Sequence, residues 1–364
     1  MTVEIRAPGR NTLIDGLRAV AVFCVLLHHW TNWGFQFGFG QIGVQTFFVI
    51  SGFLITAILL TARSRAESST RSALFEIRSF FIRRTLRIFP IYYLLLGFIF
   101  LVDRFGIRES IYWHALYMSN IYFFIKGEFE GSLSHLWTLS VEEQFYLVWP
   151  WMALFTPKRW LPFGICFLIV LAPTTRALLY ATGHHEYAQY NTLVCANFDS
   201  LGCGALLAWA HTSAQQLQRD LILRTVYIGA LVSLMIVAIS FLIGDKIITI
   251  TLDQLALAVI VTAILQAMQL GGKHPIIGFL SWSPLVYFGQ ISYGIYLYHM
   301  FAPNIANLLR VPEFLKQGPI GFATMTAITL FVASVSWFVV ERPVNSLKTL
   351  FPYFRTQAAL IRGA

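Results

Sequence analysis

Long apolar segments separated by short polar stretches recur along the whole 364-residue chain. A helix of about 20 mainly apolar residues is long enough to cross the hydrocarbon core of a bilayer. The pattern therefore predicts an all-α integral membrane protein, built as a bundle of about ten transmembrane helices. We expect these helices near residues 13–33, 42–62, 85–103, 137–156, 160–180, 197–211, 223–243, 247–270, 285–306 and 319–340.

The distribution of Lys and Arg orients this bundle. Cytoplasmic loops of membrane proteins carry an excess of both residues, and most of the 26 Lys and Arg residues fall in the tails and the even-numbered loops. We therefore expect both termini in the cytoplasm. The polar segment from Arg63 to Arg78 then forms a cytoplasmic linker, and the stretch from Asp103 to Trp137 forms a long outer loop, a candidate re-entrant segment.

Composition supports a membrane protein and excludes other classes. Hydrophobic residues make up 57% of the chain and charged residues 12%, whereas a soluble domain has about 25% charged residues. The net charge of +9 follows from the loop asymmetry, so the lipid bilayer is the expected partner and nucleic acid is not. The N-terminus, "MTVEIRAPGRNTLIDG", lacks the layout of a cleavable signal, so we expect the first apolar segment to remain as an anchor. The four cysteines have no metal-site spacing, and we interpret them as packed thiols, with no metal expected: Cys24, Cys166, Cys195 and Cys203.

The first span, "IDGLRAVAVFCVLLHHW", carries ionisable residues at both ends. At about 100° per residue, Asp15, Arg18 and His29 share one face of a helix, whereas His28 lies about 80° away from Arg18. The rise from Arg18 to His29 is roughly 16 Å. Because ionisable side chains are costly in lipid, this face is expected to point into a cavity or the bundle interior. The alternative is an interfacial cap formed by "HHW" at the headgroup level.

Two stretches follow in the next spans. In "GVQTFFVISGFLIT" (43–56), Gly and Ser residues among large aromatic residues predict close approach of a neighbouring helix. In "RRTLRIFPIYY", Arg84 and Arg87 share a helical face at the cytoplasmic start of a span, and Pro90 allows a local break. Two guanidinium groups so placed suit a phosphate. Anchoring by the positive-inside rule is the alternative.

The stretch "HLWTLSVEEQFYLVWP" (135–150) begins a span on the outer side. Glu142 and Glu143 are adjacent and point to different faces, so at most one of them needs to face a cavity. Either carboxylate is a candidate for orienting or charge-balancing a histidine at the same outer level. Acidity that complements the helix macrodipole is the alternative.

Two stretches near the C-terminus add candidates. In "ISYGIYLYHM", Tyr293 and His299 stand among tyrosines that interfacial belts would also explain. In "FVVERP", Glu341 lies at the inner end of the last span, and pairing with Arg342 is its simplest interpretation.

Together these stretches resemble the membrane-bound acyltransferase family 3, whose members modify peptidoglycan, O-antigen and other bacterial surface glycans. The motifs "DGLRAVAV", "GVQTFFVISGF", "WTLSVEEQFYLVWP" and "SYGIYLYH" occur in the family's order, and the resemblance runs from Asp15 to Pro343. It implies a bundle in the bacterial cytoplasmic (inner) membrane that takes an acyl group, usually acetyl from cytoplasmic acetyl-CoA, and delivers it to a hydroxyl outside. It also implies one membrane domain over 1–364, with a core over 11–343, a cytoplasmic tail over 344–364, and no SGNH domain of the kind some relatives carry.

The resemblance also assigns roles to single residues. The positions that match the family's first-span arginine and histidine and its RxxR pair are Arg18, His29, Arg84 and Arg87. The glutamate of its "SVEEQFY" motif corresponds to Glu142, which is therefore preferred over Glu143. This chain departs from many relatives at Gln45, where they carry Asp, so a role of that carboxylate is not carried over to this chain.

The resulting hypothesis places the donor phosphates on the three arginines and the reaction at His29. With Glu142 assisting, His29 would deprotonate a hydroxyl of a glycan or lipid-linked saccharide for attack on the thioester, and a covalent acyl intermediate stays open. The residues expected to contact substrate are Asp15, Trp137, Ser140, Tyr293 and His299. A transporter or flippase of a glycan-related substrate, or a structural scaffold, are the rival classes. The acceptor, the acyl group and the oligomeric state are left open.

Overall fold

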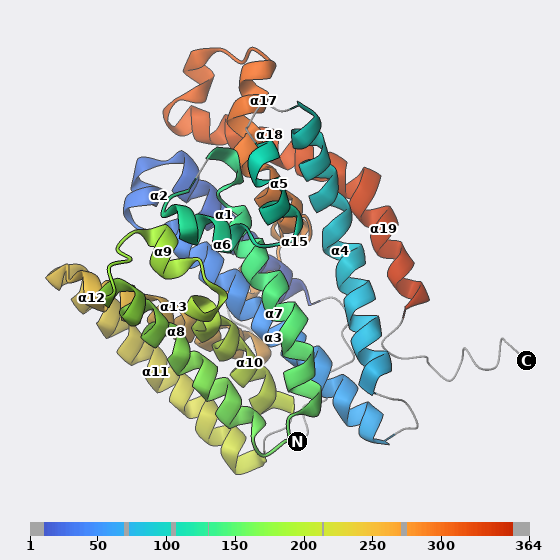
Figure 1. Ribbon diagram of the computed structural model, residues 1–364, viewed down its shortest axis with the longest axis vertical. Coiled ribbons are helices and arrows are strands. Elements are labelled where there is room, and N and C mark those ends of the chain that lie inside the picture. Colours follow the sequence, from blue (N-terminus) through green and yellow to red (C-terminus); the bar gives the residue numbers. More distant parts are fainter. Residues whose placement is uncertain are drawn as a thin grey trace, which may run out of the picture.

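The computed structural model describes residues 11–68, 73–102, 107–129, 131–212, 215–270 and 275–351. The structure is 89% helical, and these residues contain no strand, which confirms the all-α class (Figure 1). Both outermost tails (1–10 and 352–364), with part of the expected linker (69–72) and of the expected outer loop (103–106), lie outside the described residues.

The longer helices follow the apolar segments of the sequence. They are α1 (Thr12–Trp30), α3 (Phe39–Ser68), α4 (Ala73–Val102), α7 (Leu136–Phe155), α8 (Leu161–Ala181), α10 (Phe198–Thr212), α11 (Gln216–Ile243), α13 (Gln254–Leu270) and α18 (Gly318–Ser336). The shorter helices are α2 (Asn32–Gln36), α5 (Ile107–Ala115), α6 (Ser119–Lys126), α9 (Tyr187–Asn191), α12 (Lys246–Ile248), α14 (Pro275–Leu280), α15 (Ser283–Gln290), α16 (Ser292–Tyr298), α17 (Ala302–Leu308) and α19 (Arg342–Ser346). Single turns of 3₁₀ or π helix join them: η1 (Gly131–Leu133), η2 (Val194–Asn197), η3 (Thr249–Asp253), η4 (His299–Phe301), η5 (Glu313–Lys316), η6 (Trp337–Glu341) and η7 (Leu347–Leu350).

Within the described residues, seven helical segments are long and apolar enough to cross a membrane, so the chain is a multi-pass membrane protein. They are Thr12–Trp30, Phe39–Glu67, Ala73–Val102, Leu161–Ala181, Gln216–Ile243, Lys246–Gln269 and Gly318–Leu350, and each overlaps one of the ten predicted spans. The other three predicted spans are not confirmed. Of these, α7 and α10 are largely buried helices, and the region 285–306 is divided among α15, α16, η4 and α17. The cytoplasmic position of both termini stays a prediction.

Three expectations about the connections need correction or refinement. The described part of the segment from Arg63 to Arg78 is helical, because α3 runs on to Ser68 and α4 already begins at Ala73. Its Arg, Glu and Ala residues favour helix, so both helices extend beyond their apolar segments. Pro90 does not break α4, which is continuous around it (Figure 1); neighbouring helices let membrane helices tolerate proline. The described part of the expected outer loop contains α5, α6 and η1.

Helix α3 lies at the centre of the bundle, in contact with α1, α7, α10 and α13. Glycines permit two of these contacts. A Cβ atom at Gly43 would lie 2.5 Å from the carbonyl oxygen of Ala21 on α1, and one at Gly52 would lie 2.0 Å from the carbonyl oxygen of Leu201 on α10. The predicted close approach of neighbouring helices to this segment is thus confirmed.

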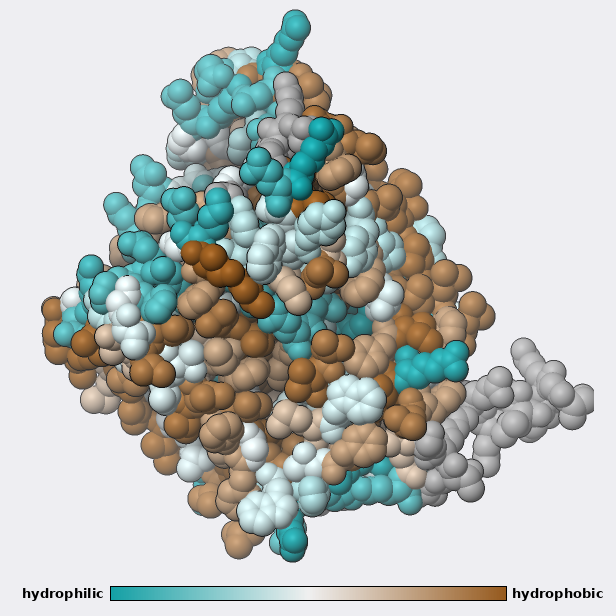
Figure 2. All heavy atoms as spheres, in the orientation of Figure 1, coloured by the Kyte–Doolittle hydropathy of each residue, from teal (hydrophilic) through white to brown (hydrophobic). Residues whose placement is uncertain are grey.

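The exterior is rich in large apolar side chains. On α4, for example, Leu94, Phe98 and Leu101 are exposed, and hydrophobic side chains cover much of the visible face in Figure 2, with hydrophilic ones gathered toward the upper end and the lower rim. Contiguous apolar surface on this scale does not suit contact with water. It fits contact with lipid.

A buried ion pair joins α8 to α10. Arg176 and Asp199 are both fully buried, with Arg176 Nη2 2.7 Å from Asp199 Oδ2. Arg176 also donates to the carbonyl oxygens of Ile250 (2.8 Å), Thr251 (3.0 Å) and Ala196 (2.5 Å). This guanidinium is therefore satisfied within the protein and has a structural role.

Candidate functional site

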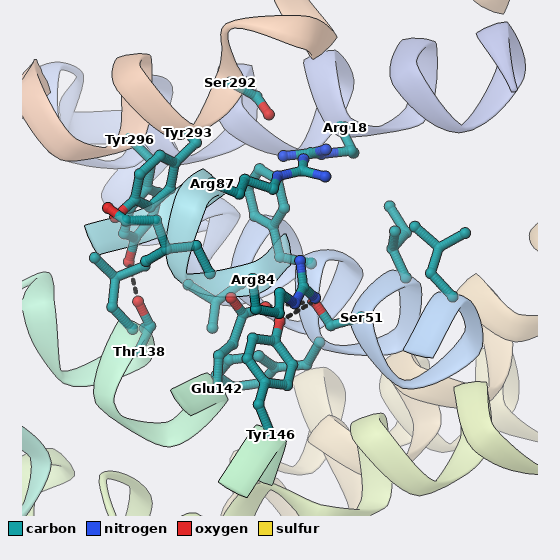
Figure 3. A pocket seen from close by; sticks show the side chains of 17 residues that line it. Arg18, Ser51, Arg84, Arg87, Thr138, Glu142, Tyr146, Ser292, Tyr293 and Tyr296 are labelled. Atoms are coloured by element: carbon teal, nitrogen blue, oxygen red, sulfur yellow. Dashed lines mark hydrogen bonds between the residues drawn. The ribbon is translucent and has the colours of Figure 1, made fainter. Parts of the chain in front are cut away.

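A cavity of about 80 Å³ opens between α1, α3, α4, α7 and α16 (Figure 3). Polar side chains from all five helices line it. They are Arg18, Ser51, Arg84, Arg87, Thr138, Glu142, Tyr146, Ser292, Tyr293 and Tyr296. We call it the arginine cavity, because three of its lining residues are arginines from two different helices.

The three arginines come together at one cavity, with Arg84 and Arg87 on one helical face as their spacing predicts. Arg18 reaches the cavity from α1, and Arg84 and Arg87 reach it from successive turns of α4. Figure 3 shows the guanidinium groups of Arg18 and Arg87 side by side, with Arg84 nearer to Ser51. The Arg84 guanidinium also lies 4.2 Å from the ring centre of Tyr146, a cation–π contact. Like charges this close repel, so the arrangement suits an anionic ligand.

Glu142 is the carboxylate that faces this cavity. The Ser51 hydroxyl donates to Glu142 Oε1 at 2.5 Å, and the Tyr146 hydroxyl donates to Ser51 Oγ at 3.0 Å. Glu143 does not line the cavity, and its Oε1 atom is buried without a hydrogen-bond partner. The structure thus separates the two adjacent carboxylates in the way that their helical positions require.

His29 lies at the far end of α1 from Arg18 and does not line the arginine cavity. Its side chain is exposed, and its ring centre is 5.0 Å from that of His299. The His299 ring is in turn 5.0 Å from that of His135. We call His29, His135 and His299 the histidine cluster. Among the described residues, no group of three or more His, Cys, Asp or Glu side chains is placed to hold a metal ion.

Tyr296 stands between the arginine cavity and the histidine cluster. It lines the cavity, yet its ring centre is 5.5 Å from those of both His135 and His299. Its hydroxyl is 2.6 Å from Thr138 Oγ1, which also lines the cavity (Figure 3). Glu142 is therefore held with the arginines, on the other side of Tyr296 from His29. The expectation that Glu142 sits at the level of the histidine is wrong.

The other residues expected to contact substrate are placed differently from one another. Tyr293 lines the arginine cavity and donates to the carbonyl oxygen of Ile88 at 3.2 Å. Asp15 precedes Arg18 on α1 but does not line the cavity. His299 is fully buried in the histidine cluster.

Trp137 and Ser140 do not reach the arginine cavity. Trp137 is buried with its ring against Phe48, at a centroid distance of 6.3 Å, and Ser140 Oγ is 2.6 Å from Ser119 Oγ. Ser140 lies about 200° around the helix from Glu142, which explains why it faces the opposite way. Both side chains pack the interior.

The polar cavity residues that were not predicted as site residues are Ser51, Thr138, Tyr146, Ser292 and Tyr296, although Ser292 and Tyr296 belong to the stretch "ISYGIYLYHM" that the sequence singled out. Thr138 and Tyr146 stand four residues before and after Glu142, so a stripe of one helical face would have found them. Ser292 gives no such signal, because α16 is a short helix. Its orientation depends on the interruption between α15 and α16.

Two further residues singled out in the sequence are Gln45 and Glu341. Gln45 is buried, and its Oε1 accepts a hydrogen bond from Ser200 Oγ, so the amide that replaces the common Asp ties α3 to α10. Glu341 accepts a hydrogen bond from Ser336 Oγ at 3.3 Å, while Arg342 lies over the ring of Phe338. The adjacent side chains of Glu341 and Arg342 therefore contact different partners.

Fold and cavity together define a multi-pass membrane protein that gathers cationic side chains around an internal cavity. A family described as an acyltransferase domain matches residues 11–339. The chain belongs to this family, membrane-bound acyltransferase family 3, which confirms the resemblance drawn from its motifs.

Similar curated proteins include YrhL of Bacillus subtilis (strain 168), which is 29% identical over 360 residues, covering 92% of this chain and 54% of YrhL. The peptidoglycan O-acetyltransferase OatA of Listeria monocytogenes is 28% identical over 354 residues, covering 91% of this chain and 55% of OatA. The O-acetyltransferase OatA of Staphylococcus aureus (strain NCTC 8325 / PS 47) is 26% identical over 361 residues, covering 91% and 57%. This chain thus spans about half the length of the relatives it matches. No solved structure matches it significantly.

Proposed function

We propose that this protein transfers an acetyl group from cytoplasmic acetyl-CoA to a hydroxyl of a glycan on the other side of the bacterial inner membrane. Family membership supports acyl transfer. The names of both OatA relatives specify O-acetyltransferase, and the Listeria name specifies peptidoglycan. Peptidoglycan is therefore the glycan we propose first. Residues 11–343 act as one catalytic membrane unit in this proposal.

The observation that carries the proposal is the convergence of Arg18, Arg84 and Arg87 on one cavity. Ionisable groups inside a membrane protein are costly and mark substrate sites. Guanidinium groups bind phosphate oxygens bidentately, and coenzyme A is a small molecule with several phosphates. Its charge would offset the mutual repulsion of the three arginines. The negative charge of Glu142, which accepts a hydrogen bond from Ser51, offsets part of the positive charge of the three arginines.

The acetyl thioester then has to reach His29. Arg18 and His29 are roughly 16 Å apart along the axis of α1, a span that the extended pantetheine arm covers. Tyr296 contacts both the cavity and the histidine cluster, so in this proposal its hydrogen bond to Thr138 opens to let the arm pass. Phosphates at the arginines and thioester at the histidine cluster thus describe one bound donor.

At the histidine cluster the exposed His29 acts as general base. One ring nitrogen takes the proton of the acceptor hydroxyl while the hydroxyl oxygen forms a bond to the acetyl carbon. The carbon–sulfur bond breaks, and the coenzyme A thiolate leaves with the electron pair. The His29 imidazolium returns its proton to that thiolate. The products are the acetyl ester and the free thiol.

The test uses the full chain in lipid nanodiscs with radiolabelled acetyl-CoA and isolated peptidoglycan glycan strands. His29→Ala should lower transfer by roughly 10²- to 10⁴-fold, the usual contribution of a general base, and leave acetyl-CoA binding unchanged. Arg87→Met should weaken acetyl-CoA binding about 10- to 100-fold, since bonds to charged groups are worth about 1.5–3 kcal/mol. His28→Gln is the matched control and should retain activity.

Three results would contradict the proposal. Full transfer by His29→Ala would refute His29 as the base. Unchanged acetyl-CoA binding by Arg87→Met would refute the arginine cavity as the donor site. Wild-type protein that moves saccharide across a sealed vesicle without acetylating it would favour the transporter class. Transfer to another surface glycan but not to peptidoglycan strands would refute only the choice of acceptor.

A further inference from the structure

His299 has one ring nitrogen whose proton can be assigned. The residue lies at the 3₁₀ turn η4 between α16 and α17 and is fully buried. Its Nδ1 atom is 2.6 Å from the carbonyl oxygen of Tyr296. A carbonyl oxygen only accepts hydrogen bonds, so the proton is assigned to Nδ1. In the neutral ring, Nε2 is then an acceptor with a free lone pair.

The Nε2 atom of His299 is buried without a hydrogen-bond partner. A buried polar atom in this condition costs about 1–3 kcal/mol, so a donor next to it would be stabilising. Among the described residues, the rings next to that of His299 are those of His29, Trp30, His135 and Tyr296.

Two of these rings are already committed elsewhere. His135 Nε2 is 3.2 Å from the carbonyl oxygen of Leu297, which assigns its single neutral-state proton to that bond. The Tyr296 hydroxyl is engaged with Thr138 and with the His135 carbonyl. The N–H donors left to His299 are the imidazole of His29 and the indole of Trp30.

The ring spacing fits a bond from His29. Two ring nitrogens joined by a hydrogen bond of about 2.9 Å bring their imidazole centres to roughly 5 Å. The His29 and His299 ring centres are 5.0 Å apart, and the larger Trp30 ring, with its centre 6.3 Å away, is the competing donor. A small rotation of the His29 ring would therefore suffice to form the bond. His29 is also the exposed member of the cluster, so a nitrogen that does not bond to His299 can be reached by substrate.

We propose that His299 is the positioning residue for His29: the buried Nε2 atom of His299 accepts the His29 N–H and leaves the other His29 nitrogen as the base. This role deepens the proposed function and rests on it. A fixed tautomer is what a neutral imidazole needs to act as a base, because only the nitrogen without a proton can take one. The partner that orients His29 is thus a second histidine, and the expected carboxylate, Glu142, stays with the arginines. His299 acts through His29 and does not touch the glycan.

The activity test compares two substitutions at one position. His299→Phe keeps a ring in the space but removes the acceptor, and should lower kcat roughly 10- to 100-fold, the range found when partners that orient metal-bound imidazoles are removed. His299→Gln restores both functions, since its amide N–H₂ can donate to the Tyr296 carbonyl and its Oε1 can accept from His29. It should recover most of kcat. The KM for acetyl-CoA should not change in either variant, because the arginine cavity is untouched.

Three activity outcomes would overturn the assignment. They are wild-type kcat in His299→Phe, a His299→Gln protein as slow as His299→Phe, and a changed KM for acetyl-CoA with unchanged kcat. Trp30→Phe removes the competing donor and should leave kcat within about two-fold of wild type. A loss equal to that of His299→Phe would instead assign the bond to Trp30.

A second measurement does not depend on acyl transfer. Nitrogen-15 histidine labelling of the full chain in nanodiscs should show a scalar coupling between a His29 ring nitrogen and His299 Nε2, lost in His299→Phe. Absence of that coupling in the wild type overturns the inference even if acetyl transfer is confirmed. If the coupling is present in a protein that transfers no acetyl group, the proposed function fails and the hydrogen bond stands.

Discussion

Replacement of Gly52 by alanine is the sharpest test of how the helices are held together. Gly52 lies on α3 where this helix crosses α10, and the added Cβ atom would lie 2.0 Å from the carbonyl oxygen of Leu201 and 2.8 Å from its carbonyl carbon. Ordinary contacts of a Cβ atom begin near 3.4 Å. The obstacle is backbone, which has no rotamer to change, so the two helices have to move apart by more than about 1 Å.

The cost can be set against the gain in helix propensity. Overpacking of this kind destabilises by about 1–3 kcal/mol, and alanine in place of glycine in a helix returns at most about 1 kcal/mol. We expect a net loss of about 1–2 kcal/mol. Thermal unfolding in detergent, followed by tryptophan fluorescence at a fixed scan rate, should then show an apparent Tm several degrees lower. Acetyl transfer should fall as well, because the adjacent Ser51 would be pulled from its 2.5 Å hydrogen bond to Glu142.

Gly97 provides the matched control. It lies within α4, and a Cβ atom added there would meet nothing within 4 Å. Gly97→Ala should therefore leave Tm unchanged or raise it slightly. If Gly52→Ala unfolds at the wild-type temperature or above that of Gly97→Ala, the close contact between α3 and α10 does not exist as described and the reasoning is refuted.

Two further changes probe the buried polar groups. Arg176→Met should destabilise the protein by about 3–5 kcal/mol, because Asp199 would be left as an unpaired buried charge. Adding Asp199→Leu to this variant should recover much of the lost stability in thermal unfolding. A double variant no more stable than the single one would contradict the pairing. Ser51→Ala removes the hydroxyl that holds Glu142 and should raise the KM for acetyl-CoA a few-fold with Tm nearly unchanged. A changed kcat with unchanged KM would place Ser51 away from the donor.

Much of the arginine cavity could be predicted from local sequence. Arg84 and Arg87 lie one turn apart on a helix, so they have to share a face, and Glu142 and Glu143 have to diverge. The structure bears out both statements. The level of Glu142 along the membrane could not be predicted. It depends on the offset of α7 along α3, and neither segment's sequence indicates that offset.

The histidine cluster shows the opposite case. His29, His135 and His299 belong to three segments far apart in the chain, and the last of them lies at a turn where the expected ninth span breaks. An unbroken helix over 285–306 would have carried His299 along a different path. Apolar content reports that a segment is buried or in lipid, and it does not report where a helix is interrupted.

The sequence by itself determined the membrane class, the helical fold, the family and the facing of side chains within each helix, because hydropathy and the 3.6-residue repeat act on neighbours in the chain. Tertiary structure alone decided which helices cross, since backbone contacts such as that at Gly52 set their separation and offset. It thereby placed Glu142 with the arginines and Tyr296 between these and His29. Those positions depend on the packing of whole helices, a sum over many contacts that no single motif records.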